Sequence, residues 1–376
     1  MARFIHTADL HLGRMLYGER LLDDQILVLG QLIREIERHS PDALLIAGDV
    51  FDRSVPPAEA VDALDDFLYA VVGELGVPVV MIPGNHDSAD RLGFGARLLG
   101  KGLHIVSTLD RCTSPLQISD AHGPVDIYGL PFLEPVRVAH HLKNPEIRSH
   151  QDATEAMLET IKSAQSTPRS VLIAHAFVTG AEESDSERPL SLGGLDTVDA
   201  AVFDGFSAVA LGHLHRPQSV GRASVQYAGS PMRYSTSEVG YTKSFSMIEI
   251  DGSGEAKVSR LPINAARDLV VLEGTLDALI KGEHPARPDD FVVAKLTDKG
   301  PVHNGMSRLR ERWPNALHIE RVHPETGNDT PLAGADHRQL SISELFDTFF
   351  EAVAGEPMSD EERAEMNEIL NAASRS

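Results

Sequence analysis

Between residue 1 and about residue 250, short apolar runs rich in Val, Ile and Leu alternate with polar stretches. Five of these runs end in polar clusters, and they lie in the segments ARFIHTADLHL, ALLIAGDVFD, VPVVMIPGNHDS, SVLIAHAFV and SAVALGHLH. Continuous apolar runs of this kind are typical of strands that are buried on both faces. The pattern therefore predicts five buried strands with polar side chains at their carboxyl ends.

Two segments between these runs, LLDDQILVLGQLIREIERH and AVDALDDFLYAVVGEL, have the apolar spacing of amphipathic helices. Strands that alternate with helices indicate βαβ units and a largely parallel sheet. In such sheets, functional sites form outside the carboxyl ends of the strands. We therefore expect the five polar clusters to converge on one site.

The pattern changes after the fifth run. SVQYAGS and SFSMIEID resemble short antiparallel strands, and SGEAKVSRLPINAARD resembles a linker. Residues 268 to about 323 alternate strand-like and helix-like segments, which predicts a small α+β unit. The turn-rich stretch PETGNDTPLAGADHRQ is predicted to be a second linker.

The C-terminal segment SISELFDTFFEAV places its large apolar residues on one helical face. That face includes Leu345, Phe346, Phe349 and Phe350. It either packs on its own domain or fills the groove of a partner protein, and its position after a turn-rich linker favours the partner. The following SDEE is a capping box that opens a second, acidic helix.

Composition narrows the class of protein. The chain has 376 residues, which suggests two domains, and its net charge is −22. It has one cysteine, Cys112, and no apolar run long enough to span a membrane. No secretory leader is expected, and a single cysteine fits a reducing cytoplasm. The acidity argues against a general electrostatic hold on nucleic acid, unless metal ions or a partner supply positive charge.

The polar clusters contain seven side chains of the kind that bind metals. They are Asp9, His11, Asp49, Asn85, His175, His213 and His215. Carboxylate, amide and imidazole ligands suit Mn²⁺, Zn²⁺ or Fe²⁺. Seven are too many for one such ion, but they suit two ions, roughly 3.5–4 Å apart, that share a bridging carboxylate. The absence of cysteine ligands argues against a structural zinc site.

Spacing adds to this hypothesis. In an extended segment, the D-x-H and H-x-H spacings place both side chains on one side. Gly48, Gly84 and Gly212 flank the ligands, which is typical of turns with unusual dihedral angles or close backbone approach. Each short motif alone is weak, but the ordered set of D-x-H, GD, GNHD, H and GHxH is highly specific.

That ordered set resembles the calcineurin-like metallophosphoesterases. The flanking segments HTADLHLGR, AGDVFDRSVPP, PGNHDS, SERPLSLGG, LGHLHRPQ and YAGSPMRYS resemble the nuclease subunits of bacterial DNA-repair complexes, relatives of the eukaryotic MRN nuclease. The resemblance implies an α/β fold, a four-layer α-β-β-α sandwich with a small α+β capping domain and C-terminal helices. The corresponding domains are a nuclease domain at 1–255, a capping domain at 266–324 and a partner-binding segment at 340–373.

The resemblance also implies roles for individual residues. One ion would be held by Asp9, His11 and His215, the other by Asn85, His175 and His213, and Asp49 would bridge them. His86 would assist the leaving 3′ oxygen. Asp87 would either orient His86 or cap the following helix. Asp52 lies where some relatives have a histidine, and Arg14 and Arg53 are weaker candidates for contacts to DNA.

As an activity, the resemblance implies a Mn²⁺-dependent DNA nuclease, an exonuclease on duplex ends and an endonuclease on single strands and hairpins. It further implies an SMC-like ATPase partner and a homodimer. Two other hypotheses remain at this point. A phosphatase or nucleotide phosphodiesterase would keep the metals and change the substrate, and a non-catalytic scaffold would have lost ligands.

For several other residues the expected role is structural. His6 is predicted to be a strand residue, Trp313 and Phe206 are predicted to lie in the core, and Cys112 is predicted to be a small, partly buried hydrophobic residue. The acidic run EESDSER is either a solvated loop or a loop beside the site, and the resemblance favours the second interpretation.

Overall fold

The structure is a computed structural model. It describes residues 1–100, 102–187, 197–322 and 357–373, and in addition positions 343, 346, 347 and 350. Within these residues, no helix combines the length and the apolar character that crossing a membrane requires.

The first of two large sheets contains the predicted strands of the N-terminal part of the chain. Its strands, in spatial order, are β16 (Ala256–Pro262), β15 (Ser244–Ile250), β1 (Ala2–Thr7), β4 (Ala43–Ala47), β5 (Val79–Ile82) and β6 (Leu103–Ile105). From β1 to β6 the strands are parallel, and β15 and β16 add an antiparallel edge. All residues of β4 and β5 are buried, as continuous apolar runs predict.

The second sheet is built from later segments. Its strands, in spatial order, are β13 (Gln218–Val220), β14 (Arg222–Tyr227), β12 (Ala208–Gly212), β9 (Ser170–His175), β8 (Gly123–Leu130) and β7 (Leu116–Asp120). The central strands β14, β12, β9 and β8 are parallel, whereas β13 and β7 are antiparallel to their neighbours. The five predicted strands thus divide between two sheets, three in the first and two in the second.

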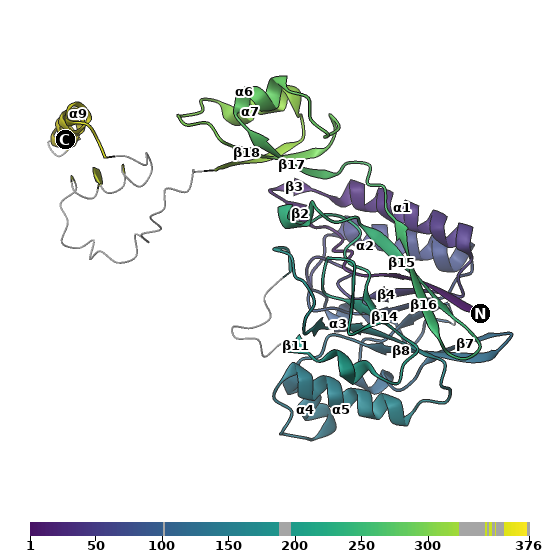
Figure 1. Cartoon of the computed structure of the whole chain (residues 1–376). Helices are drawn as coiled ribbons and strands as arrows, with labels where there is room; N and C mark the ends of the chain where they lie inside the picture. The colour runs from purple at the N-terminus through teal and green to yellow at the C-terminus, as the bar shows by residue number, and fades with distance from the viewer. Residues whose placement is uncertain are drawn as a thin grey trace.

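Helices cover the outer faces of the two sheets (Figure 1). The helices α1 (Leu22–His39) and α2 (Ala58–Leu68) lie on the first sheet, and α4 (Pro135–Leu142) and α5 (His150–Ser163) lie on the second. The order helix, sheet, sheet, helix is the predicted four-layer sandwich. Side chains from the inner faces of both sheets, such as Leu45 and Ile173, form the apolar core between them.

Shorter elements complete this part of the chain. They are β2 (Met15–Leu16), β3 (Glu19–Arg20), α3 (Ala89–Leu92), β10 (Phe177–Val178), β11 (Thr197–Val198), the 3₁₀ turns Leu109–Arg111, Ala200–Phe203 and Thr236–Glu238, and a π-helix, Tyr69–Glu74, that continues α2. Two predictions are wrong. Residues 256–262, predicted as part of a linker, form the edge strand β16, and β14 pairs in parallel with β12 rather than only antiparallel.

A second, smaller unit follows, which we call the cap. It consists of a parallel three-stranded sheet and two helices, namely β17 (Leu269–Gly274), α6 (Leu276–Lys281), β18 (Phe291–Leu296), α7 (Gly305–Arg312) and β19 (Ala316–Arg321). Its core contains the fully buried Trp313, as predicted, and the indole N–H donates to the carbonyl oxygen of Leu279 at 3.1 Å. Every strand and helix predicted for this region is therefore confirmed.

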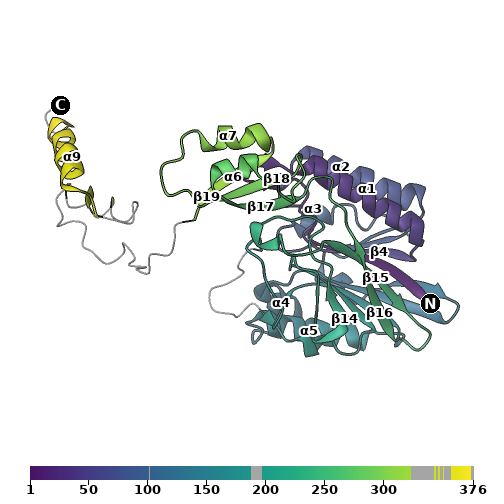
Figure 2. The ribbon, with the colours of Figure 1, turned by 45° about the horizontal axis from the view of Figure 1, so that its top comes forward.

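The cap lies beside the β2–β3 hairpin (Figure 1) and near α1 (Figure 2). The guanidinium of Arg267 donates to both carboxylate oxygens of Asp24, which is only 3% exposed. The rings of Tyr17 and His318 stack with centroids 4.8 Å apart. These contacts, one before the first strand of the cap and one in its last strand, fix the cap against the sandwich.

At the C-terminus, the predicted capping box is confirmed. The hydroxyl of Ser359 accepts from the backbone N–H of Glu362 and donates to its carboxylate, and α9 (Asp360–Ala373) follows. Of the predicted partner-binding residues, Leu345 and Phe349 lie outside the described residues, whereas positions 346 and 350 are helical. The predicted linker after residue 322 also lies outside the described residues.

Candidate metal centre

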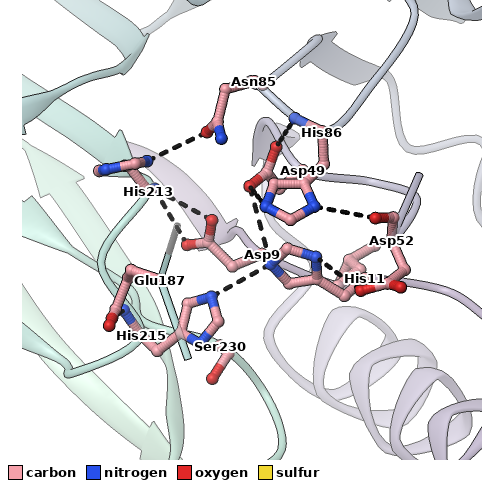
Figure 3. Close-up of polar contacts among 12 residues, drawn as sticks. Asp9, His11, Asp49, Asp52, Asn85, His86, Glu187, His213, His215 and Ser230 are labelled. Carbon is pink, nitrogen blue, oxygen red and sulfur yellow. Dashed lines mark hydrogen bonds and ion pairs between the residues drawn. The ribbon is translucent and has the colours of Figure 1, made fainter. Parts of the chain in front are cut away.

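All seven predicted ligands meet at one edge of the sandwich, and both sheets contribute. Figure 3 shows six of them, all except His175, with their side chains directed toward one another. Asp9 and His11 follow β1, Asp49 follows β4 and Asn85 follows β5, so these four come from the first sheet. The second sheet contributes His175 at the end of β9, and His213 and His215 just after β12. The convergence expected from strand ends is therefore present, although it joins two sheets rather than one.

One group contains Asp9, His11 and His215, whose ligand atoms lie within 4.8 Å of one another. The Nε2 atoms of His11 and His215 face each other at 3.1 Å. The carboxylate of Asp9 accepts from the backbone N–H of His213 at 3.0 and 3.2 Å, which fixes its orientation. This is the set that the sequence assigns to one ion.

A second group surrounds Asn85. Its side-chain oxygen lies 2.9 Å from Nε2 of His175 and 3.1 Å from Nδ1 of His213. The opposite ring nitrogen of His175, Nδ1, donates to the carbonyl oxygen of Ala47 at 2.9 Å, so Nε2 carries the lone pair that faces the site. These three side chains are the set that the sequence assigns to the other ion.

Asp49 lies between the two groups. Its Oδ2 atom is 3.6 Å from Nε2 of His175 and 3.7 Å from Nε2 of His11, while Oδ1 accepts from the backbone N–H of His86 at 2.8 Å. One carboxylate oxygen thus faces ligands of both groups, which is the position that a bridging ligand requires.

Three glycines allow the strand ends to approach this closely. A Cβ atom at Gly212 would lie 1.8 Å from the carbonyl oxygen of Ala47, and one at Gly84 would lie 2.2 Å from Oδ1 of Asp49. At Gly48, φ is +87° and a Cβ would lie 2.4 Å from Nδ1 of His175. Side chains at these positions would push the two sheets apart, so the prediction of close backbone approach is confirmed.

The backbone at four of the ligands adopts positive φ, which non-glycine residues rarely do. The angles are 52° at Asp9, 46° at His11, 48° at Asp49 and 109° at His213. Such conformations cost on the order of 1–3 kcal/mol each and persist where the surrounding structure enforces them. The fold therefore aims these side chains inward at a cost in stability.

The electrostatics of the group favour a bound cation. Burial, together with the nearby charge of Asp49, raises the pKa of Asp9 well above its usual range. Burial is also the main cause that lowers the pKa of His175 to about 4 and that of His213 well below its usual value. The histidines are therefore neutral, as metal ligands must be, and a divalent cation would favour ionisation of the crowded carboxylates. The residues present thus fit two divalent ions.

His86 lies at the rim of this group and is 6% exposed. Its Nδ1 atom donates to the carbonyl oxygen of Asp52 at 2.8 Å, since a carbonyl can only accept. Its Nε2 atom lies 3.9 Å from Oδ2 of Asp49, so this nitrogen faces the candidate metal centre.

Of the two roles expected for Asp87, its contacts contradict the capping of the following helix. Its carboxylate accepts from the backbone N–H groups of Val50, Phe51 and Gly84 at 2.9–3.0 Å, while the helix cap is the hydroxyl of Ser88. Burial and the charge of Asp49 raise the pKa of Asp87 to about 6. Asp87 therefore holds together the two loops that carry Asp49 and His86. The prediction that it caps the following helix is wrong, and its role in orienting His86 stays a prediction.

The two candidate DNA contacts differ in their surroundings. Arg14 is directed into the protein, where it donates to the carboxylate of Asp52 at 3.3 Å and to the carbonyl oxygen of Ser186 at 3.2 Å, and its guanidinium lies over the ring of Tyr234. Arg53, in contrast, is exposed near the rim of the site. Contact between DNA and either arginine stays a prediction.

Residues that the sequence reasoning missed support the ligands from behind. Ser186 and Glu187, from the acidic run, hydrogen-bond to His215, so that run lies beside the site as expected. The buried pair Glu238 and Lys243 lies behind Ser186. These side chains carry no motif of their own, and only the three-dimensional contacts identify them.

Comparisons with known proteins agree with this geometry. A family model described as calcineurin-like phosphoesterase matches residues 2–217, and one described as type 5 capsule protein repressor C-terminal domain matches residues 265–354. The SbcD subunit of the nuclease SbcCD from Staphylococcus epidermidis is 30% identical over 375 residues, which cover 98% of each chain. The chain belongs to the SbcD family of calcineurin-like phosphoesterases. It is therefore a hydrolase of the metallophosphoesterase type.

Two solved structures show a more distant similarity to this SbcD family member. TT1561 of Thermus thermophilus is 13% identical and matches with a TM-score of 0.39, covering 69% of this chain and 98% of its own. A dimetal phosphatase from Danio rerio is 14% identical, with a TM-score of 0.37, covering 70% of this chain and 99% of its own.

Proposed function

We propose that the chain is a Mn²⁺-dependent DNA nuclease that processes DNA ends with an SbcC-type, SMC-like ATPase partner in the cytoplasm. The observation that carries this proposal is the convergence of all seven predicted ligands, with Asp49 between the two groups and His86 at the rim. A scaffold that had lost catalysis would be expected to lack part of this set. Membership of the SbcD family supports DNA over a small phosphoester as the substrate.

In this proposal, one ion is held by Asp9, His11 and His215, the other by Asn85, His175 and His213, and Asp49 contacts both. The donor atoms are oxygen and imidazole nitrogen without a thiolate, which suits Mn²⁺. When bound, two such ions supply Lewis-acid activation of water and of the phosphodiester. The protein supplies rigid ligand positions, which the positive φ angles and the close glycine contacts enforce.

His86 is proposed to assist the leaving 3′ oxygen. Because its Nδ1 proton is directed to the carbonyl oxygen of Asp52, Nε2 is the nitrogen that can take up a proton and deliver it toward the phosphate. Asp87 acts indirectly, because its three backbone hydrogen bonds keep the loops of Asp49 and His86 in register.

The proposed substrates are duplex ends for exonucleolytic cleavage and single strands or hairpins for endonucleolytic cleavage. A net charge of −22 makes the isolated chain a poor general binder of DNA. We therefore propose that the ATPase partner supplies most of the basic surface, while Arg53 contributes at the rim. The C-terminal face with Leu345, Phe346, Phe349 and Phe350 is proposed to bind that partner.

A homodimer is also proposed. The segment after the PGNHDS turn exposes Phe94 by 88% and Leu98 by 90%, and Val136 at the start of α4 is 81% exposed. Large apolar side chains with this much exposure usually mark an interaction surface when they gather on one face. The segment that carries Phe94 and Leu98 is the proposed contact between two copies.

The test uses the purified chain and a labelled duplex closed by a hairpin, incubated in Mn²⁺, in Mg²⁺ and in EDTA. We expect Mn²⁺-dependent cleavage that His86→Ala reduces by two or more orders of magnitude, while His86→Ala still binds two ions. A small phosphodiester, assayed in parallel, separates a nuclease from a general phosphodiesterase. Cleavage of the small ester alone, also in the presence of the ATPase partner, would contradict the proposal, as would DNA cleavage by His86→Ala at the parental rate.

A further inference from the structure

His215 is held by contacts to its backbone and to its ring. Its backbone N–H donates to Oε1 of Glu187 at 2.6 Å, and its carbonyl oxygen accepts from Nζ of Lys243 at 2.8 Å. Its Nδ1 atom lies 2.6 Å from the hydroxyl oxygen of Ser186. Three of its four polar atoms are thus occupied from behind, and Nε2 alone faces the site.

A buried ion pair lies behind Ser186. The Ser186 hydroxyl donates to Oε1 of Glu238 at 2.6 Å, and Glu238 is fully buried. Lys243 uses its three N–H groups on Oε2 of Glu238, on the hydroxyl of Ser230 at 2.8 Å and on the His215 carbonyl. Burying two charges carries a large desolvation cost. A hydrophobic pair of similar volume often stabilises a fold at least as much as a buried ion pair does. Stability alone therefore does not explain this pair.

The direction of each hydrogen bond follows from the carboxylate. Oε2 of Glu238 accepts from the ammonium group of Lys243, and the oxygens of a carboxylate in such an ion pair can only accept. The single hydroxyl proton of Ser186 is therefore directed to Glu238, which leaves an oxygen lone pair facing His215. Nδ1 of His215 must then carry the ring proton, and Nε2 carries the lone pair.

We propose that Ser186, Glu238 and Lys243 are positioning residues that fix the tautomer and orientation of His215 for metal binding. This inference rests on the proposed metal set. The chain of contacts runs from Lys243 through Glu238 and Ser186 to Nδ1 of His215, and its effect is to aim the Nε2 lone pair at the position shared with His11 and Asp9. Removing such a partner of a ligating histidine typically lowers metal affinity about 10- to 100-fold.

The test measures metal binding rather than activity. The metal-free parent, Ser186→Ala, Ser186→Thr and the double variant Glu238→Gln/Lys243→Met are titrated with Mn²⁺ by calorimetry. The double variant removes both buried charges together, so that neither is left unpaired. Asp126→Asn is the matched control, because it replaces another fully buried carboxylate at the opposite end of the second sheet.

We expect the parent and Asp126→Asn to bind two ions. In Ser186→Ala and in the double variant, one of the two ions should bind about tenfold or more weakly while the other is unchanged. Ser186→Thr, which keeps the hydroxyl, should restore parental binding. If both ions bind Ser186→Ala and the double variant as tightly as the parent, the positioning role is refuted. If the parent binds no ion, the proposed metal set itself fails, and this inference with it.

Discussion

Replacing Gly212 by alanine should damage the metal centre without altering a ligand. Gly212 ends β12 of the second sheet, and a Cβ there would lie 1.8 Å from the carbonyl oxygen of Ala47, in β4 of the first sheet. Because the contacting atom belongs to the backbone, no side-chain rotation relieves the overlap. The two sheets must separate locally by more than an ångström, or the end of β12 must shift.

The cost has two parts. Overpacking in a well-packed interior typically costs about 1–3 kcal/mol. The same carbonyl oxygen accepts the Nδ1 proton of His175 at 2.9 Å, and losing that hydrogen bond adds about 1 kcal/mol. We therefore expect Gly212→Ala to lower the free energy of unfolding by about 2–4 kcal/mol and, because His175 loses its anchor, to weaken one ion about tenfold or more.

Urea unfolding in EDTA measures the first effect, and calorimetric titration with Mn²⁺ measures the second. Gly240→Ala is the matched control, since a Cβ at Gly240 meets no atom within 4 Å. Parental unfolding and parental ion affinity in Gly212→Ala would show that the close approach of the two sheets does not position His175, and the reasoning would fail.

Three further predictions concern pH, the cap and the dimer. Burial lowers the pKa of His6 in the folded chain to about 3. As the pH falls below about 6.5, the imidazole of His6 is therefore protonated in the unfolded chain but not in the folded one, and the free energy of unfolding decreases by about 1.4 kcal/mol per pH unit. Urea unfolding of the metal-free chain at pH 7.0 and 5.5 measures this loss. Between these pH values, His6→Leu should lose about 1.4 kcal/mol less stability than the parent, and an equal loss would contradict the assignment. Arg267→Ala leaves the buried Asp24 without its guanidinium partner, so it should lower the free energy of unfolding by about 3–5 kcal/mol and speed proteolysis near the cap. Arg20→Ala, the control at an exposed ion pair, should lower it by less than about 1 kcal/mol. Phe94→Ser should shift the sedimentation of the protein from dimer to monomer, and an unchanged dimer would place the contact elsewhere.

The candidate site was predictable from the sequence because its residues follow buried strands directly. A continuous apolar run predicts a buried strand, and the carboxyl ends of neighbouring parallel strands lie at the same edge of a sheet. Because the ligands follow these strands within a few residues, the sequence predicts that they lie at that edge. The same local logic found the capping box at Ser359 and the core position of Trp313. Such features depend only on residues close together in the chain, so they can be recognised in a single sequence.

Features that depend on distant pairing were missed or misjudged. The edge strand β16 is largely solvent-accessible and lacks an apolar run, so its residues resembled a linker until its pairing with β15 was known. The contacts of Ser186, Glu187 and Glu238 with His215 join segments separated by 23 to 29 residues, and nothing in the spacing marks them. Asp87 sits in the right motif, yet the path of the turn directs its carboxylate to backbone N–H groups.

The division of the ligands between two sheets has a consequence for the time at which the enzyme becomes active. The first sheet supplies Asp9 to Asn85, but the set is complete only with His215, and the support behind that histidine comes from Lys243 still later in the chain. A growing polypeptide that has folded only β1, β4 and β5 therefore holds four of the seven ligands, and it cannot assemble both ion positions until the second sheet closes over the first. The order of the segments thus delays hydrolytic capacity until synthesis of the sandwich is nearly finished.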